Sequence, residues 1–328
     1  MNETNPNTTA NSADDGASDV TPTKKPAAEK NAGGLVKKIF RTILGILVVL
    51  TLIGAWITWG VNQQREAVQW VLDRGGDVVY RIERGDKNQY LIMDEMKKQP
   101  NGWLLDYVGI DYISDVIGVH LPVGELTDLT PLNYFTGLQE ISIAGNQVTD
   151  ISNLARMKDL RELMLNQNPI SDISVCANLP KLEVLDISRT NVTDISPIQN
   201  CQKLKNFRAC ATELKDIGPL AGKPDLTEIS LAESAVVDIS PIGEVKNLVS
   251  LDIQKTKVTD LSPLRNLENL KKMDMELAAV ADATPLHDCK NLEFLVLEES
   301  NVTPQGIADL KAALPNLKIG SKRYEPGR

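Results

Sequence analysis

The sequence predicts an α/β repeat fold, a solenoid of short strands in which each turn stacks on the next. Leucine recurs at a 22-residue period from Leu138 to Leu292, and apolar residues alternate within each turn, as in Leu163 and Leu165. This alternation is typical of a strand with one buried face. Because one turn alone cannot bury that face, a continuous core requires stacked turns.

A second apolar set follows each strand, for example Val192, Ile195 and Ile198. Since the strand already forms one inner wall, this set has to line the opposite one. The series extends backward to Val116 and closes at Leu317 after a longer last turn. We therefore expect a solenoid of about nine turns over residues 116–320, followed by a tail at 321–328.

Three units carry a resemblance to a known family. Residues 146–153 (NQVTDISN), 190–198 (TNVTDISPI) and 256–264 (TKVTDLSPL) resemble the repeats of internalin-like bacterial leucine-rich-repeat proteins. The resemblance implies a right-handed solenoid with a parallel sheet on its concave face and short 3-10 or irregular segments on its convex face. It also implies binding of a protein or glycan through the concave face.

The chain departs from the family pattern at the asparagine position of the repeat. Asparagine stands there only at Asn146 and Asn168, and Ala278 cannot form a side-chain hydrogen bond at all. Small hydroxyls, which can still bond the backbone of a turn, hold the other positions: Thr190, Thr212, Ser234, Thr256 and Ser300. At Ala209 a large core residue is missing, so we expect looser packing there, with Phe207 compensating.

The N-terminal part contains a candidate membrane anchor. Residues 1–38 are poor in large apolar side chains and are expected to form a disordered cytoplasmic tail. Residues 42–61 carry no charge and would span about 30 Å as a helix, so we assign a transmembrane helix to residues 39–61. A buried core helix would show a polar face, and a cleaved signal peptide would be shorter and end in a small-residue site.

The flanks of this segment predict its orientation. Lys30, Lys37, Lys38 and Arg41 crowd the N-terminal side, whereas uncharged polar residues begin the other side. The positive-inside rule then keeps the N-terminus in the cytoplasm and places the repeats outside it, in the periplasm or at the cell surface.

Residues 62–115 do not repeat and are expected to cap the open end of the solenoid. We expect a helix over 65–74 that ends at Gly75 and Gly76, a strand around Tyr80, a turn at 85–86 and a helix after Asn101. The alternative for the aromatic residues of this segment is a separate ligand site.

Composition and motifs exclude several classes of function. A net charge of −9 argues against nucleic-acid binding. The sequence has four cysteines, no C-x-x-C pair and two histidines, so it offers no zinc, redox or cofactor motif. Cys201 and Cys289 precede core leucines and are expected to be core residues. Neither His120 nor His287 has a nucleophile motif beside it, so we do not expect an enzyme.

An aspartate recurs once in each turn, and a row of carboxylates invites a calcium site. We prefer a structural role, because each aspartate precedes a tight turn whose free backbone amides it can bond. Calcium-binding repeats also supply several oxygen ligands and glycines per turn, which are missing here. The row comprises Asp128, Asp150, Asp172, Asp194, Asp216, Asp238, Asp260 and Asp282.

The residues predicted to point outward from the strands are mostly acidic. Arg189, Lys255 and Lys272 add positive charges among them, and Glu299 a further negative one. The face is either a solvated charged surface or a docking surface for a basic or mixed-charge partner. Our candidate partner-binding residues are Glu140, Glu162, Asp186, Arg208, Glu228, Asp252, Asp274, Glu276, Phe294 and Glu298.

Together these observations predict a membrane-anchored binding protein that recognises a protein or glycan through its acidic concave face. The alternative is a structural or scaffold protein of the cell envelope without a discrete ligand.

Overall fold

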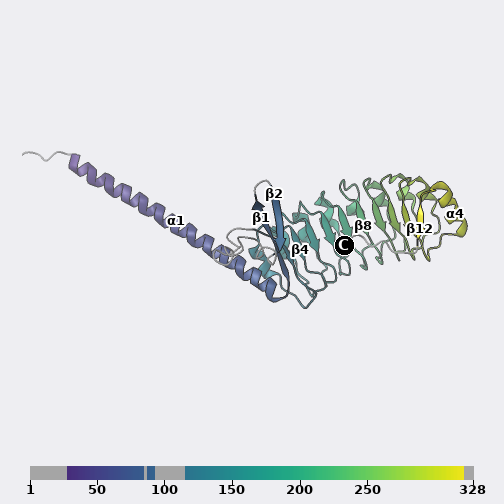
Figure 1. Cartoon of the computed structure of the whole chain (residues 1–328), viewed down its shortest axis with the longest axis horizontal. Coiled ribbons are helices and arrows are strands. Elements are labelled where there is room, and N and C mark those ends of the chain that lie inside the picture. Colours follow the sequence, from purple (N-terminus) through teal and green to yellow (C-terminus); the bar gives the residue numbers. More distant parts are fainter. Residues whose placement is uncertain (1–27, 85–86, 93–114, 321–328) are drawn as a thin grey trace, which may run out of the picture. The chain divides into compact units, whose positions relative to one another are not determined.

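The structure, a computed structural model, describes the backbone of residues 28–84, 87–92 and 115–320 and the side chains of residues 37–81 and 115–320. The expected turn at 85–86, the helix after Asn101 and the tail at 321–328 lie outside these residues. One twelve-stranded sheet has the order β12-β11-β10-β9-β8-β7-β6-β5-β4-β3-β1-β2. From β3 onward the strands stack in chain order (Figure 1).

The repeat forms the predicted parallel sheet. Glu140 pairs with Glu162 and Ile141 with Leu163, so each strand moves the register on by one sequence period. The parallel strands are β3 (Asp115–His120), β4 (Glu140–Ser142), β5 (Glu162–Met164), β6 (Val184–Asp186), β7 (Asn206–Arg208), β8 (Glu228–Ser230), β9 (Ser250–Asp252), β10 (Lys272–Asp274), β11 (Phe294–Val296) and β12 (Lys318–Gly320).

Short 3-10 helices return the chain on the other side of the core, as the sequence predicts. Proline occupies the first turn of most of them, where its fixed φ and missing N–H are tolerated. They are η2 (Thr130–Tyr134), η3 (Ser152–Arg156), η4 (Ser174–Asn178), η5 (Ser196–Asn200), η6 (Gly218–Leu220), η7 (Ser240–Glu244), η8 (Ser262–Asn266) and η9 (Thr284–Asp288).

The aspartate row caps these helices, which confirms the predicted structural role. Asp150 Oδ1 accepts the backbone N–H of Ser152 at 2.8 Å, and Asp194 does the same for Ser196 at 2.7 Å. Equivalent bonds occur at all the other positions of the row: Asp128, Asp172, Asp216, Asp238, Asp260 and Asp282.

The core of the solenoid is almost purely aliphatic. The periodic leucines from Leu138 to Leu292 are all buried, and Val192, Ile195 and Ile198 line the opposite wall as predicted. Phe207 and Ala209 are both fully buried, so an aromatic ring stands beside the small residue of that turn. Cys201 and Cys289 are core residues, again as predicted.

The asparagine position changes character along the solenoid. Asn168 Nδ2 donates to the carbonyl of Ile143 in the preceding turn at 2.8 Å, and its Oδ1 accepts from Val148 N. Thr190 and Thr256 instead donate to carbonyls of their own turns, and Thr190 Oγ1 also accepts from Val192 N of the same turn. At this position of the repeat, the side-chain hydrogen bonds between turns are therefore made by the two asparagines.

A residue with positive φ follows every strand from β4 to β11. Gly145 holds this place in the first of these turns, but the later turns use residues with side chains, at a cost of roughly 1–2 kcal/mol each. The N–H groups of these residues form hydrogen bonds to the next turn. Ala211 N, for example, donates to Ala232 O at 2.7 Å. The column comprises Gly145, Gln167, Arg189, Ala211, Glu233, Lys255, Leu277 and Glu299.

Helix α1 (Ala28–Asp73) contains both the predicted transmembrane segment and the predicted capping helix. It begins at Ala28, so residues 28–38 are helical, in contrast to the disordered tail expected up to residue 38. No proline interrupts this stretch, and extending an existing helix costs little compared with starting one. For the same reason the uncharged residues 62–64, which lie between the two predicted helices, continue the helix.

The end of α1 belongs to the same compact unit as the repeats, residues 58–328. Gly75 (φ +72°) ends the helix as predicted: Gly76 N donates to Val71 O and Gly75 N to Leu72 O. The buried Ala67, Val68 and Val71 join the core of the solenoid.

Strand β1 (Asp77–Arg84) pairs antiparallel with both β2 (Lys87–Ile92) and β3, and Tyr80 of β1 is fully buried. The last turn differs from the others, because helix α4 (Pro304–Ala313) replaces the 3-10 helix. Thr303 caps it by accepting from Gly306 N at 3.1 Å.

Candidate functional site

The side of the parallel sheet that faces away from the core is called the concave face below. Each strand from β4 to β10 presents its first and third residues there and buries its middle residue, as in Glu228, Ile229 and Ser230. Eight of the ten candidate residues lie at these outward strand positions, one on each strand from β4 to β11. The other two, Glu276 and Glu298, lie just beyond the ends of β10 and β11.

Not every charge expected on the strands lies there. Arg189, Lys255 and Glu299 occupy the positive-φ column after the strands, so they lie at the edge of the concave face. The three-residue strands are shorter than the alternating sequence pattern suggested, because the left-handed residue turns the chain away.

At the N-terminal end of the concave face, two glutamates pair directly across adjacent strands. Glu140 and Glu162 face each other in register. Burial raises the pKa of Glu162, and the neighbouring charge of Glu140 raises it further. His120 Nε2 lies 3.7 Å from Glu140 Oε2, and this interaction raises the pKa of His120 in spite of its partial burial.

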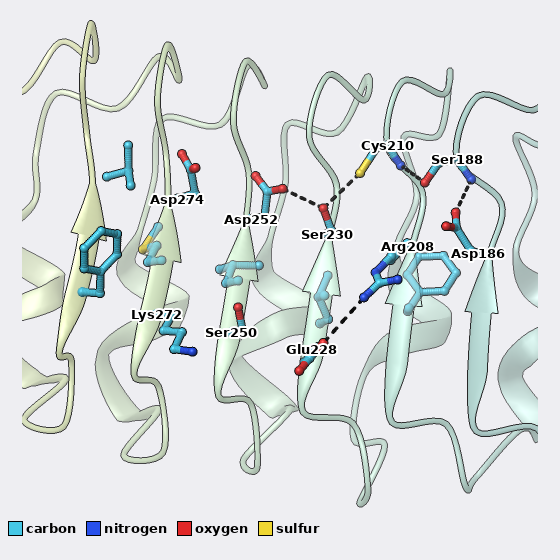
Figure 2. A pocket seen from close by; sticks show the side chains of 16 residues that line it. Asp186, Ser188, Arg208, Cys210, Glu228, Ser230, Ser250, Asp252, Lys272 and Asp274 are labelled. Carbon is cyan, nitrogen blue, oxygen red and sulfur yellow. Dashed lines mark hydrogen bonds and ion pairs between the residues drawn. The ribbon is translucent and has the colours of Figure 1, made fainter. Parts of the chain in front are cut away.

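The central part of the concave face is hollowed. The cavity has a volume of about 360 Å³ and brings together residues from β6 to β11 (Figure 2). Small side chains at outward positions leave this space, notably Cys210, Ser230 and Ser250. The hollow contains six of the ten candidate residues: Asp186, Arg208, Glu228, Asp252, Asp274 and Phe294.

A line of hydrogen bonds crosses the floor of this central hollow. Ser230 Oγ donates to Asp252 Oδ2 at 2.7 Å, and Cys210 Sγ lies 3.0 Å from Ser230 Oγ. Cys210 N also donates to Ser188 Oγ at 3.0 Å. Asp252 Oδ1 accepts from the backbone of Gln254, so both of its carboxylate oxygens hold fixed positions.

The hollow holds two cationic side chains, one of which lies beside a carboxylate. Arg208 lies 4.0 Å from Glu228, whose Oε2 also accepts from Asn206 Nδ2 at 2.8 Å. Lys272 lies on the neighbouring strand to Ser250. Four carboxylates face two cations in the hollow, so its formal charge is negative: Asp186, Glu228, Asp252 and Asp274 against Arg208 and Lys272.

The sequence did not reveal the hollow itself. The candidates did not include four small residues that line it: Ser188, Cys210, Ser230 and Ser250. Small residues at outward positions between larger ones were the sequence feature that could have indicated a hollow. Four adjacent strands had to be placed in register before these residues could be recognised as neighbours.

The described side chains include four cysteines and the carboxylates of the concave face. Among residues 37–81 and 115–320, no group of three or more His, Cys, Asp or Glu could hold a metal ion. The four cysteines are free thiols. Burial raises the pKa of each of them, to about 11 for Cys289, so these thiols are mostly protonated at neutral pH, and only Cys210 is partly exposed to reagents.

Comparison with known proteins agrees with this architecture. The family model described as "Leucine Rich repeats (2 copies)" matches residues 158–200. An internalin of Listeria monocytogenes, InlF, is 25% identical with a TM-score of 0.59, covering 70% of this chain and 62% of its own. Internalin C2 of the same organism is 27% identical with a TM-score of 0.52, covering 56% and 80%. The chain is an internalin-like leucine-rich-repeat protein.

This internalin-like chain therefore spans less than two thirds of InlF. A leucine-rich-repeat protein of Leptospira interrogans shares the fold at 19% identity and a TM-score of 0.50, covering 59% of this chain and 57% of its own. No curated protein matches the sequence. Leucine-rich-repeat proteins generally bind other proteins, and their solenoids offer an extended concave surface for that purpose.

Proposed function

We propose that this chain is a membrane-anchored binding protein, not an enzyme, and that it holds a protein partner on its acidic concave face outside the cytoplasm. The observation that carries the proposal is the central hollow of that face, where carboxylates outnumber cations and six of the ten candidate residues meet. A flat solvated surface would not need such a concentration of outward charges around one cavity.

Helix α1 supports the anchoring part of the proposal. Between Lys37 and Asp73 it is long and apolar enough to cross a membrane, and the apolar window is unburied by the rest of the protein. Apolar side chains such as Leu50, Leu52 and Trp56 are exposed there. Water penalises that exposure, whereas a bilayer would accept it and would place Trp56 and Trp59 in an interfacial belt.

A protein partner is favoured over a glycan by the composition of the concave face. Carboxylates steer and orient a basic protein surface through complementary charge. An uncharged sugar gains nothing from that field and is better bound by aromatic side chains, of which the hollow exposes only Phe294 in part.

The test of the concave face is capture of a partner by residues 58–328, which contain the complete core from Ala67 to Leu317. The triple variant Glu228→Lys, Asp252→Lys, Asp274→Lys should lose the partner that the native fragment retains from an envelope extract. The matched control reverses three exposed loop carboxylates, Glu213, Asp225 and Glu268, and should retain it. Equal retention by both triple variants would move the binding site away from the concave face.

The orientation has a separate test. Protease added to intact spheroplasts should digest the repeats and leave a fragment that ends near residue 61, because the N-terminal flank carries the basic residues. Protection of the repeats in intact spheroplasts, with digestion after lysis, would contradict the proposed location. A chain that is digested but captures no partner at all would favour the scaffold alternative.

A further inference from the structure

We infer that the central hollow receives one cationic side chain, a lysine or arginine, from an extended segment of the partner, and that an apolar side chain four residues along that segment packs on Phe294. The inference rests on the proposed function, since it specifies what the concave face binds.

The floor of the hollow is built from hydrogen-bond acceptors. The hydroxyl of Ser230 donates its single hydrogen to Asp252, so the Cys210 thiol has to donate to Ser230 Oγ. Their hydrogens are therefore committed within the protein. What these two residues and Asp252 offer to the cavity are sulfur and oxygen lone pairs, which suit a donor-only group such as an ammonium or guanidinium.

Charge selects the same kind of group. Asp252 and Asp274 are neighbours in register on β9 and β10. Each Asp252 oxygen already accepts one hydrogen bond, and a carboxylate oxygen can accept a second. Arg208 is paired with Glu228 (Figure 2), which partly offsets its charge.

The spacing of the two proposed contacts follows from the sheet. Asp252 lies on β9 and Phe294 on β11, two strands further along. Adjacent strands are about 4.8 Å apart, so the two positions are roughly 10 Å apart across the strands. Phe294 also lies two residues before Val296, which is in register with Asp274 and hence with Asp252, so the full separation is about 12 Å. An extended segment advances about 3.3 Å per residue and returns to the same face every second residue, so four residues cover about 13 Å with both side chains on one face. The partner is thus expected to carry a basic and an apolar residue at positions i and i+4.

Cys210 offers a direct probe of the hollow, because it is the one partly exposed cysteine among the four. The full-length chain in lipid nanodiscs is treated with two thiol reagents of the same size, a cationic trimethylammonium-ethyl and an anionic sulfonato-ethyl methanethiosulfonate. The cationic reagent should modify Cys210 about tenfold faster at low salt, because a cavity with negative walls concentrates cations. Intact mass gives the rates, and Cys210→Ser gives the background.

A charge variant assigns the preference to the hollow. Asp252→Asn keeps an oxygen for Ser230 and removes the charge, so it should reduce the rate ratio of the two reagents several-fold. Asp225→Asn, on an exposed loop, removes the same charge elsewhere and should leave the ratio unchanged. Equal rates in the native chain, a faster anionic reagent or no modification by either reagent would each overturn the inference.

Peptides test the proposed occupant. The peptide acetyl-Gly-Arg-Ser-Gly-Ser-Leu-Ser-amide should slow modification of Cys210 by a neutral methanethiosulfonate. Replacing its arginine by the uncharged isostere citrulline should weaken protection about tenfold, the value of one charge-assisted hydrogen bond. Replacing leucine by glycine should weaken it less. No protection, or equal protection by the arginine and citrulline peptides, would refute a cationic occupant even where the charge-reversed triple variant still loses the partner.

Discussion

The ammonium group of Lys223 lies 2.8 Å from the carbonyl oxygen of Ile198, inside the wall of the solenoid. The side chain is only 2% exposed and also donates to Cys201 O at 3.1 Å. Burial lowers the pKa of Lys223. The other turns fill the same position with apolar side chains: Phe135, Met157, Leu179, Cys201, Val245, Leu267 and Cys289.

The substitution Lys223→Met should therefore stabilise the protein, by about 1–2 kcal/mol, because an apolar side chain of similar length avoids the desolvation of a charge. The carbonyls of Ile198 and Cys201 keep partners without the lysine, since they also accept from Cys201 N and Leu204 N. Urea unfolding of residues 58–328 measures the difference. Lys203→Met, on an exposed loop, should change the free energy of unfolding by less than about 0.5 kcal/mol.

The pH dependence of this difference has a defined sign. The pKa of Lys223 is lowered in the folded state, so the cost of burying the charge is present at neutral pH and is relieved as the pH rises toward the ordinary value of 10.5. The advantage of Lys223→Met should shrink between neutral and alkaline pH. A destabilised variant would mean that the bonds of the ammonium outweigh its desolvation.

Asn168 should be far harder to replace than Thr256, although both occupy the same position of the repeat. Asn168→Ala removes the acceptor of the buried Val148 N–H and the link to Ile143, and should cost about 2–4 kcal/mol. Thr256→Ala removes one bond to Ile253 O, which still accepts from Thr256 N, and should cost about 1 kcal/mol. Unfolding free energies compare them, and amide exchange at Val148 should accelerate only in the first variant. Equal costs would contradict a link between turns.

The repeat could be predicted from the sequence because its period repeats each position many times. The parallel strands, the aliphatic core and the capping aspartates such as Asp194 all follow from one pattern read in successive turns. Lys223 and Cys210 break that pattern, and their surroundings depend on neighbours one turn away. Their roles became visible only when the turns were in register. The sequence did not predict that α1 is one continuous helix. Its composition changes from apolar to polar at residue 62, but the backbone hydrogen bonds of the helix continue through that point.

The capping aspartates should make the solenoid sensitive to acid. The hydroxyl two residues on lowers the pKa of Asp238 and Asp260, and the backbone N–H of Ser196 lowers the pKa of Asp194. A lowered folded pKa gives stability that is present above the ordinary value of 3.8 and is lost as the pH falls through the folded value. The urea midpoint should therefore fall steeply below about pH 4.

Replacing two of these aspartates by residues that do not titrate should reduce the loss of stability at low pH. Asn keeps an acceptor oxygen for the backbone amide but does not titrate, so Asp238→Asn with Asp260→Asn should reduce the slope of stability against pH below pH 4. The paired change Asp225→Asn with Asp309→Asn alters exposed carboxylates outside the capping row and should leave the slope as it is. An unaltered slope in the first variant would show that other groups control acid unfolding.

His120 should titrate above its ordinary pKa of 6.5, and Glu140 should be the main reason. The interaction of His120 with Glu140 is the largest cause of the raised pKa of His120, and Asp77 and Glu162 on nearby strands make smaller contributions. Glu140→Gln should therefore lower the pKa of His120, and Glu162→Gln should lower it less. The proton on the imidazole Cε1 carbon in residues 58–328 reports this by NMR, with His287→Gln assigning the two histidines of the chain.

The sign for stability follows from the same shift. A raised folded pKa gives stability that is complete below 6.5 and is lost as the pH rises through the folded value. Replacing Glu140 by Gln should consequently cost more at pH 5.5 than at pH 8. Because both side chains are partly exposed, the cost should fall with added salt. An equal cost at both pH values would mean that Glu140 supports the sheet by packing alone, and that the charge of His120 does not hold β3 against β4.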